Sequence, residues 1–169
     1  MIVMAKGLGN GLAIGAVVGK AEVVESVAPN LHLSTFGGNP ISTAGALANV
    51  NYILDNDLQT NAHEVGTHLK DRLLKMAEGH KAVAEVRGRG LMLALELAGE
   101  DLTPDPGAAV RFLEACRARG LLVGKGGLKA NTIRISPPLV ITREAAHEAA
   151  DIMEEAMAEV GAATPEKVG

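Results

Sequence analysis

Aromatic residues are scarce in this chain of 169 residues. Phe36, Tyr52 and Phe112 are the whole set, there is no tryptophan, and aromatics make up 2% of the sequence. Proteins that bind single-stranded nucleic acid stack bases on aromatic side chains, so this composition disfavours that class. The formal net charge is −4, and lysine and arginine are scattered rather than clustered as phosphate neutralisation requires. We therefore expect no nucleic-acid partner.

Cysteine and long apolar runs are also nearly missing. Cys116 is the only cysteine, so no disulfide can form within the chain. A helix that crosses a bilayer needs about 20 consecutive apolar residues, and no apolar run in this sequence is that long. Lys6 and the glycines after it interrupt the first apolar stretch, which is atypical of a signal peptide. We expect a cytoplasmic protein without a membrane partner.

The histidines and the cysteine carry no recognisable chemistry. None of the five histidines has the spacing of metal ligands, so we expect no metal site. Cys116 lies in a helical pattern and is expected to be a buried small hydrophobe. The apolar content of 47% therefore comes from aliphatic residues and methionine, which is enough for one core.

Two apolar runs near the start, residues 2–5 and 13–18, flank a glycine-rich segment. This pattern predicts two strands around a loop. The first strand begins with no preceding cap or turn, so we expect the N-terminal part of a longer protein to be missing. Residues 23–27 predict a short helix, and residues 41–54 predict a buried helix with Ser42 as N-cap.

The second part of the sequence predicts a sheet with helices. Residues 62–77 have apolar positions at helical spacing and a polar opposite face. Residues 87–90 predict a turn. From residue 83 the order is strand, helix, strand, strand, helix, over the ranges 91–97, 108–118, 121–123, 132–135 and 142–160. This order predicts a small α+β unit with helices on one face of the sheet, and Thr142 caps the last helix.

Lys6 is the candidate for chemistry. It follows an apolar strand and precedes the glycines at 7, 9 and 11, which let the backbone approach a bulky ligand. A lysine amine becomes nucleophilic when desolvation or nearby cations lower its pKa. The alternative is a surface lysine in a hairpin loop. Known nucleotide motifs do not fit, because Leu12 stands where a third glycine is required and no P-loop spacing occurs.

The segment Met4–Gly11 resembles the cofactor-lysine segment of the class III aminotransferases. This family includes ornithine, acetylornithine, 4-aminobutyrate and alanine–glyoxylate aminotransferases, and the resemblance is strongest to the alanine–glyoxylate type. It implies pyridoxal 5'-phosphate as the cofactor and Lys6 as its covalent attachment. Lys6 would then also move a proton between the substrate α-carbon and the cofactor.

The segment Ser34–Pro40 resembles a second family segment, about thirty residues after the lysine. In the family a threonine hydroxyl and adjacent backbone there reach the cofactor phosphate of the neighbouring subunit. The resemblance implies that Ser34 and Thr35 bind phosphate and that the full-length enzyme is a homodimer. The alternative is an ordinary loop with a hydroxyl-capped turn.

The segment Thr132–Leu139 resembles the arginine segment of the family. That arginine commonly binds a substrate carboxylate through its planar fork, so the resemblance implies this role for Arg134. In some members it pairs with a protein glutamate, and a structural salt bridge is the alternative here. Residues 87–92 also match, and Gly88 and Gly90 are expected to shape the backbone beside solvated or paired arginines.

The resemblance implies an α/β fold: the α+β small domain of a fold-type-I aminotransferase, preceded by a remnant of the large pyridoxal-phosphate domain. We expect boundaries at 1–60, 61–163 and a tail at 164–169. Family members are more than twice as long, so several cofactor contacts are expected to be absent. The implied reaction transfers an amino group between an amino acid or amine and a keto acid. Alternatives are an aminomutase, racemase or decarboxylase, or a non-catalytic remnant that folds or dimerises.

Overall fold

The computed structural model describes residues 1–27, 31–99 and 101–162. The chain divides into two compact units, Met1–Asp57 and Leu58–Gly169. The expected boundary lay three residues later, between 60 and 61. The expected tail at 164–169 lies outside the described residues.

The first unit contains a hairpin and three helical segments. Its elements are β1 (Ile2–Met4), the 3-10 turn η1 (Lys6–Leu8), β2 (Ala16–Val18), α1 (Ala21–Val24) and α2 (Pro40–Asp55). The strands pair antiparallel with Met4 opposite Ala16. The glycine-rich segment between them, predicted as a loop, contains the single turn η1.

Helix α2 begins earlier than predicted, and its cap is a different residue. Asn39 precedes Pro40, and its side-chain oxygen accepts a hydrogen bond from the Ser42 backbone N–H at 2.9 Å. Proline at the first helical position has a φ angle suited to the helix and lacks an N–H that would go unbonded. The prediction of Ser42 as N-cap was therefore wrong, and Ser42 is a buried residue of the first turn.

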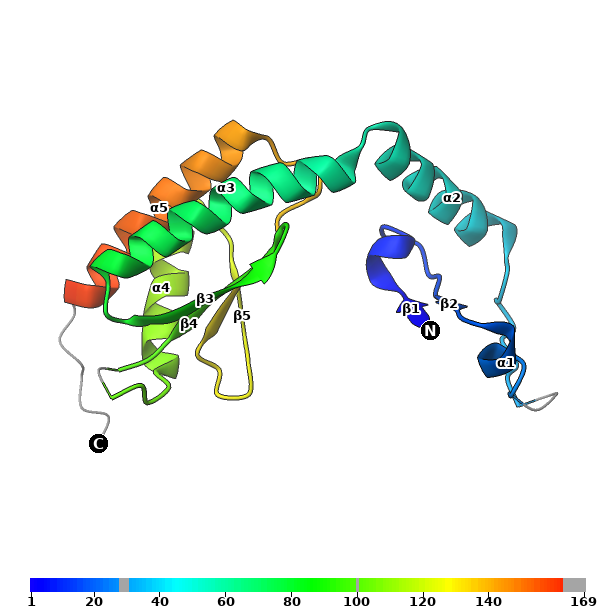
Figure 1. Cartoon of the computed structure of the whole chain (residues 1–169), viewed down its shortest axis with the longest axis horizontal. Coiled ribbons are helices and arrows are strands. Elements are labelled where there is room, and N and C mark those ends of the chain that lie inside the picture. The colour runs from blue at the N-terminus through cyan, green and yellow to red at the C-terminus, as the bar shows by residue number, and fades with distance from the viewer. Residues whose placement is uncertain (28–30, 100, 163–169) are drawn as a thin grey trace. The chain divides into compact units, whose positions relative to one another are not determined.

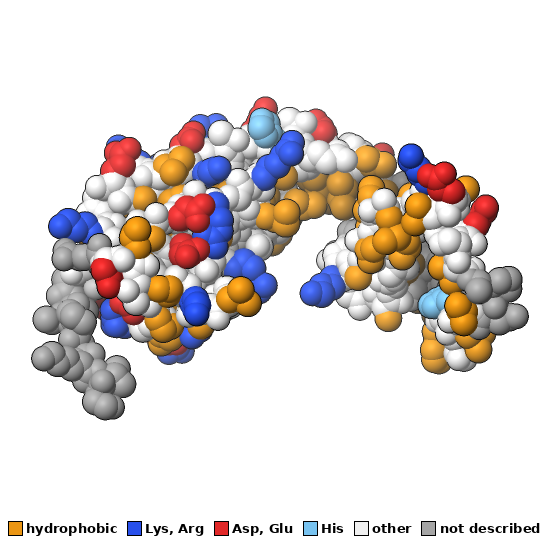
Figure 2. All heavy atoms as spheres, turned by 60° about the horizontal axis from the view of Figure 1, so that its bottom comes forward, with side chains coloured by type: hydrophobic (Ala, Val, Ile, Leu, Met, Phe, Trp, Pro, Cys, Tyr) orange, Lys and Arg blue, Asp and Glu red, His pale blue; other side chains and the backbone are white. Residues whose placement is uncertain are grey.

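The prediction that α2 is a buried helix was also wrong within the described residues. Only Ser42 and Ala46 of α2 are buried. The exposed apolar side chains of this helix include Ile41, Leu47, Tyr52 and Leu54. Figure 2 shows hydrophobic side chains gathered on the surface of this unit. The apolar pattern of α2 predicts a buried helix, but the described residues of this unit leave most of its apolar side chains exposed.

The second unit is a four-stranded antiparallel sheet with helices on one face (Figure 1). Its elements are α3 (Leu58–Gly79), β3 (Val83–Arg89), β4 (Met92–Leu97), α4 (Pro106–Ala118), β5 (Gly124–Gly126), β6 (Thr132–Ile135) and α5 (Arg143–Ala162). The strand order is β3-β4-β6-β5. Helices α3 and α5 run side by side, and α4 packs against both the sheet and α5. The predicted α+β architecture is confirmed.

Strand alternation places the core between sheet and helices. Leu93, Leu95 and Leu97 of β4 are buried, and so are Ile133 and Ile135 of β6. They meet buried helix residues in one cluster: Leu69, Leu73, Met76, Phe112, Cys116, Met153 and Met157. Burying one such large side chain contributes roughly 1.5–3 kcal/mol. Burial also raises the pKa of the Cys116 thiol to about 11, so this cysteine is a packing residue, as expected.

Two strand predictions need correction. Residues 83–89 form β3, although residues 87–90 were predicted as a turn. The outward positions of this edge strand carry the charged residues Glu85, Arg87 and Arg89, so it lacks an apolar signature. The third strand of the unit lies at Gly124–Gly126 rather than 121–123. Thr142, in contrast, caps α5 as predicted, because its hydroxyl accepts from the Ala145 N–H at 3.2 Å.

Helix α3 packs against the β3–β4 turn with the two backbones in direct contact. A Cβ added to Gly66 would lie 2.3 Å from the carbonyl carbon and oxygen of Gly90. Gly90 itself has φ +54°, a conformation that favours glycine. Two glycines therefore set the approach of α3 to the sheet.

Candidate functional site

Lys6 lies at the end of β1 and opens η1. It is exposed and has φ +52°, an uncommon conformation for a residue with a side chain. Its carbonyl accepts hydrogen bonds from the N–H groups of Gly9 at 3.1 Å and Asn10 at 3.2 Å. The turn therefore holds the Lys6 backbone in this conformation and leaves the amine accessible.

Helix α2 supports this turn from one side. The side-chain amide of Asn49 donates to the carbonyls of Gly7 at 2.8 Å and Leu8 at 3.1 Å. One helical turn earlier, a Cβ added to Gly45 would lie 2.1 Å from Leu12 Cδ1. Sequence analysis missed both residues, because these contacts join segments more than thirty residues apart.

A cleft of about 770 Å³ lies between the β1–β2 hairpin, the Ser34–Asn39 segment and the first turn of α2. Ala5, directly before Lys6, and Ser34 both line this cleft, whereas Lys6 and Thr35 do not. Its polar lining residues are His32, Ser34, Asn39, Ser42 and Thr43. No aspartate or glutamate lines it. The cleft is therefore suited to a neutral or anionic group.

Ser34 and Thr35 lie at the start of an exposed turn. The Gly37 N–H donates to the Ser34 carbonyl at 3.2 Å, which closes the turn. Across the described ranges, neither hydroxyl has a hydrogen-bond partner. Both hydroxyls are therefore free to bind a ligand.

Arg134 belongs to the second unit, on the sheet face away from the helices. Its neighbours on that face are Ala94 of β4 and Gly124 of β5. A Cβ added to Gly124 would lie 3.4 Å from the guanidinium Nε and Nη2. Within the described part of the chain, no hydrogen bond or ion pair involves the Arg134 side chain. The alternative of a structural salt bridge therefore has no support in this structure.

Arg87 lies on the same face and has a different environment. Its guanidinium contacts Glu96 at 2.5 Å and Glu85 at 2.6 Å. The hydrogen bond to Glu96 is the largest influence that raises the pKa of Arg87. Arg87 is thus paired, as expected, while Arg134 remains available to an external anion.

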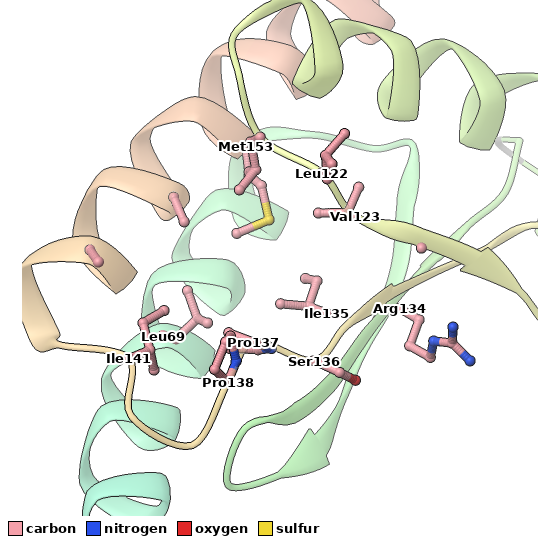
Figure 3. A pocket seen from close by; sticks show the side chains of 14 residues that line it. Leu69, Leu122, Val123, Arg134, Ile135, Ser136, Pro137, Pro138, Ile141 and Met153 are labelled. Atoms are coloured by element: carbon pink, nitrogen blue, oxygen red, sulfur yellow. The ribbon is translucent and has the colours of Figure 1, made fainter. Parts of the chain in front are cut away.

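An apolar cavity of about 470 Å³ adjoins Arg134 (Figure 3). It is lined by α3, α5, the 121–123 segment and the end of β6. Leu69, Ile135 and Met153 lie on the helix side of β6, whereas the Arg134 guanidinium points away from them (Figure 3). Arg134 itself also lines the cavity, so the cavity reaches the strand residue whose guanidinium faces the open side of the sheet.

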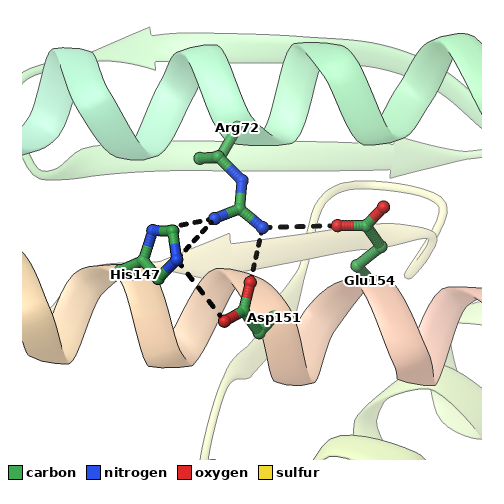
Figure 4. Close-up of polar contacts among 4 residues, drawn as sticks. All are labelled: Arg72, His147, Asp151 and Glu154. Atoms are coloured by element: carbon green, nitrogen blue, oxygen red, sulfur yellow. Dashed lines mark hydrogen bonds and ion pairs between the residues drawn. The ribbon is translucent and has the colours of Figure 1, made fainter.

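A polar cluster joins α3 to α5 (Figure 4). Arg72 contacts Asp151 at 2.5 Å, Glu154 at 3.3 Å and His147 at 2.9 Å. The rings of His68 and His147 stack with centroids 5.9 Å apart. Sequence analysis considered these histidines only as possible metal ligands and missed this arrangement.

The described residues contain neither a metal-ligand cluster nor a membrane-spanning helix. Among the residues described, no group of three or more histidine, cysteine, aspartate or glutamate side chains could hold a metal ion. None of the helices in the described ranges combines the length and apolarity needed to span a bilayer.

The family of the chain follows from its sequence. Residues 1–157 match the family model described as Aminotransferase class-III. The chain belongs to the class III aminotransferase family, which depends on pyridoxal phosphate.

Curated relatives include enzymes with different reactions. The chain is 38% identical over 162 residues to alanine–glyoxylate aminotransferase 2 homolog 2, mitochondrial, of Arabidopsis thaliana, covering 95% of this chain and 34% of that protein. It is also 38% identical over 162 residues to a leucine/methionine racemase of Thermococcus litoralis, covering 95% and 36%. The chain thus spans about a third of the length of the curated relatives it matches.

A solved structure shares the fold. An Arthrobacter phospholyase, in complex with phosphoethanolamine, superposes with a TM-score of 0.86 at 35% sequence identity. The match covers 92% of this chain and 38% of that chain. The two units therefore correspond to the C-terminal part of class III structures.

Proposed function

We propose that this polypeptide supplies the cofactor lysine, a phosphate-binding turn and a carboxylate-binding arginine to a pyridoxal-phosphate-dependent aminotransferase. The reaction transfers an amino group between an amino acid or amine and a keto acid. The carrying observation is Lys6: an accessible amine at a strand end, in a matched family segment, on a backbone held by its own turn and by α2.

Lys6 and the Ser34–Thr35 turn carry groups that suit the two ends of the cofactor. Pyridoxal phosphate, when bound, supplies the electron sink that stabilises negative charge at the substrate α-carbon. Lys6 would hold the cofactor covalently and move a proton at that carbon. The hydroxyls of Ser34 and Thr35 suit a phosphate, since hydroxyl and backbone N–H groups bind phosphate oxygens without adding charge. In the proposed homodimer these hydroxyls serve the partner's cofactor.

Arg134 is proposed to orient the substrate through its carboxylate. A guanidinium binds a carboxylate through two parallel N–H···O bonds, which fixes orientation as well as position. Its small neighbours Ala94 and Gly124 leave the face above the sheet open. The absence of a competing carboxylate partner in the described chain keeps this site available to substrate.

The first experiment tests Lys6 directly. The purified chain is mixed with pyridoxal phosphate, reduced with borohydride, and digested for peptide mass spectrometry. A dominant adduct on Lys6, lost in a Lys6→Arg variant, supports the proposal. Even labelling of all lysines, or no labelling, contradicts it for this polypeptide and favours a non-catalytic remnant that folds or dimerises.

A racemase is the second candidate, because a racemase is among the relatives at 38% identity. The two reactions differ in their products. The protein is supplied with pyridoxal phosphate, one L-amino acid and a keto acid of different carbon skeleton. Amino transfer converts the supplied amino acid into its keto acid and the supplied keto acid into a new amino acid. Racemisation converts the supplied L-amino acid into its D-enantiomer and forms no new keto acid.

A further inference from the structure

Asn49 links helix α2 to the turn that carries Lys6. It lies in the middle of α2 and is half-buried. Its amide nitrogen donates to two successive carbonyls, Gly7 at 2.8 Å and Leu8 at 3.1 Å. These are the two residues that follow Lys6 in η1.

The carbonyls of Gly7 and Leu8 accept no hydrogen bond from the N–H groups of the turn itself. Within the turn, the N–H groups of Leu8, Gly9, Asn10 and Leu12 bond to the carbonyls of Ala5, Lys6 and Gly9. None of these bonds reaches the carbonyls of Gly7 or Leu8. Asn49 thus supplies hydrogen bonds that the local backbone cannot make.

The turn needs external support because its conformation is costly. Lys6 has φ +52° and Asn10 has φ +46°, so two side-chain-bearing residues occupy the left-handed region within one short turn. Such conformations persist where the surrounding structure over-determines them. The direction of the Lys6 side chain depends on this backbone angle, so a relaxed turn would move the amine.

Helix α2 presents one stripe of residues at this contact. Ser42, Gly45, Ala46 and Asn49 follow helical spacing and form one stripe, of which Ser42 and Ala46 are buried. Gly45 admits Leu12 at a distance that no Cβ would allow. Asn39 caps the first turn of the helix, and Gly45 and Asn49 of the stripe contact the segment that follows Lys6.

We infer that Asn49 is a positioning residue that holds the Lys6 turn in the conformation needed for attachment of the cofactor. The inference rests on the proposed role of Lys6. Asn49 acts through the carbonyls of Gly7 and Leu8 rather than by contact with cofactor or substrate.

The test compares Asn49→Asp with a matched control in the other unit. An aspartate has the same shape as asparagine, and its carboxylate has no N–H to donate. Asn61→Asp is the control, because the Asn61 amide also donates to two carbonyls, Leu139 at 2.7 Å and Ile141 at 3.1 Å. Asn49→Leu is a second variant that removes both donors without adding charge and keeps a good helix former.

The readouts are the Lys6 adduct with pyridoxal phosphate after borohydride reduction and the hydrogen exchange of the turn amides. The adduct is expressed relative to Lys20, an exposed lysine of the same unit. In both Asn49 variants we expect the Lys6 to Lys20 ratio to fall about tenfold, which corresponds to roughly 1.4 kcal/mol of lost hydrogen bonding. Exchange at Gly9, Asn10 and Leu12 should accelerate, while Asn61→Asp changes neither readout.

An unchanged Lys6 to Lys20 ratio in both Asn49 variants overturns the inference. A wild-type chain that shows no preference for Lys6 contradicts the proposed function instead. In that case hydrogen exchange of the turn amides alone tests whether Asn49 holds the turn. If these amides exchange as slowly in the Asn49 variants as in the wild type, the inference about Asn49 is also rejected.

Discussion

Arg87 and Arg134 lie on the same face of one sheet, on either side of Ala94, and only Arg87 has carboxylate partners. Glu85 and Glu96 neutralise Arg87, whereas no acidic group of the described chain contacts Arg134. Two arginines in one cross-strand row therefore have different roles. One stabilises the sheet, and the other is available to a ligand.

Arg134→Gln should weaken binding of a keto acid and leave stability nearly unchanged. Hydrogen bonds to a charged group contribute about 1.5–3 kcal/mol of binding free energy, so their loss should raise the dissociation constant about tenfold or more. The unfolding free energy should change by less than about 0.5 kcal/mol, since no internal bond is lost. Calorimetric titration and denaturant unfolding measure the two effects, and Arg134→Lys should be intermediate because it keeps charge without the fork.

Arg87→Gln should show the opposite pattern. Glu85 and Glu96 are directly opposite each other across β3 and β4, so removing the cation leaves two like charges side by side. The three side chains are all more than a third exposed, so solvent screening limits the loss of stability to about 1 kcal/mol or less. Keto acid binding should be unaffected, and a fall in affinity equal to that of Arg134→Gln would contradict these assignments.

Gly66→Ala should destabilise the second unit by about 2 kcal/mol or more, because the new methyl group meets the Gly90 backbone. Gly79→Ala is the control at the other end of α3, where nothing lies within 4 Å of an added Cβ. That change should be neutral or stabilising by up to about 1 kcal/mol, since alanine favours the helix. Equal unfolding midpoints for the two variants would show that α3 can shift away from the β3–β4 turn.

Stability should fall as the pH is lowered from 7 to 5. Burial first, and then Arg143 and His147, lower the pKa of His68 below its ordinary value of 6.5. The unfolded chain therefore takes up this proton at a higher pH than the folded chain. Stability is lost as the pH falls through 6.5 toward the folded pKa, and no further loss comes from His68 below that.

Thermal unfolding across this pH range checks the prediction with two variants. His68→Gln removes the group and should flatten the dependence. His63→Gln changes an exposed histidine on the same helix and should leave the slope as in the wild type. An unaltered slope in His68→Gln would place the pH dependence elsewhere.

Much of the fold could be predicted from periodicity and motifs. Apolar spacing located α3, α4 and α5, alternation located β4 and β6, and Thr142 was correctly assigned as a cap. Strand β3 was missed because its outward residues are charged. The start of α2 was missed because the glycines, asparagine and proline before it are also typical of a loop. Local pattern identifies elements with an apolar face and fails where charge or capping chemistry sets the boundary.

The candidate site divides in the same way. The residue types and order around Lys6, Ser34, Thr35 and Arg134 were enough to predict the family, which the comparisons confirm, and to propose the role of each residue. Only the tertiary structure decided that Arg134 has no partner among the described residues and that Asn49 reaches the turn of Lys6. The same holds for the stacking of His68 on His147. Sequence determines which side chains are present, but a hydrogen bond or ion pair between distant segments depends on how helices and strands pack, and no local pattern carries that information.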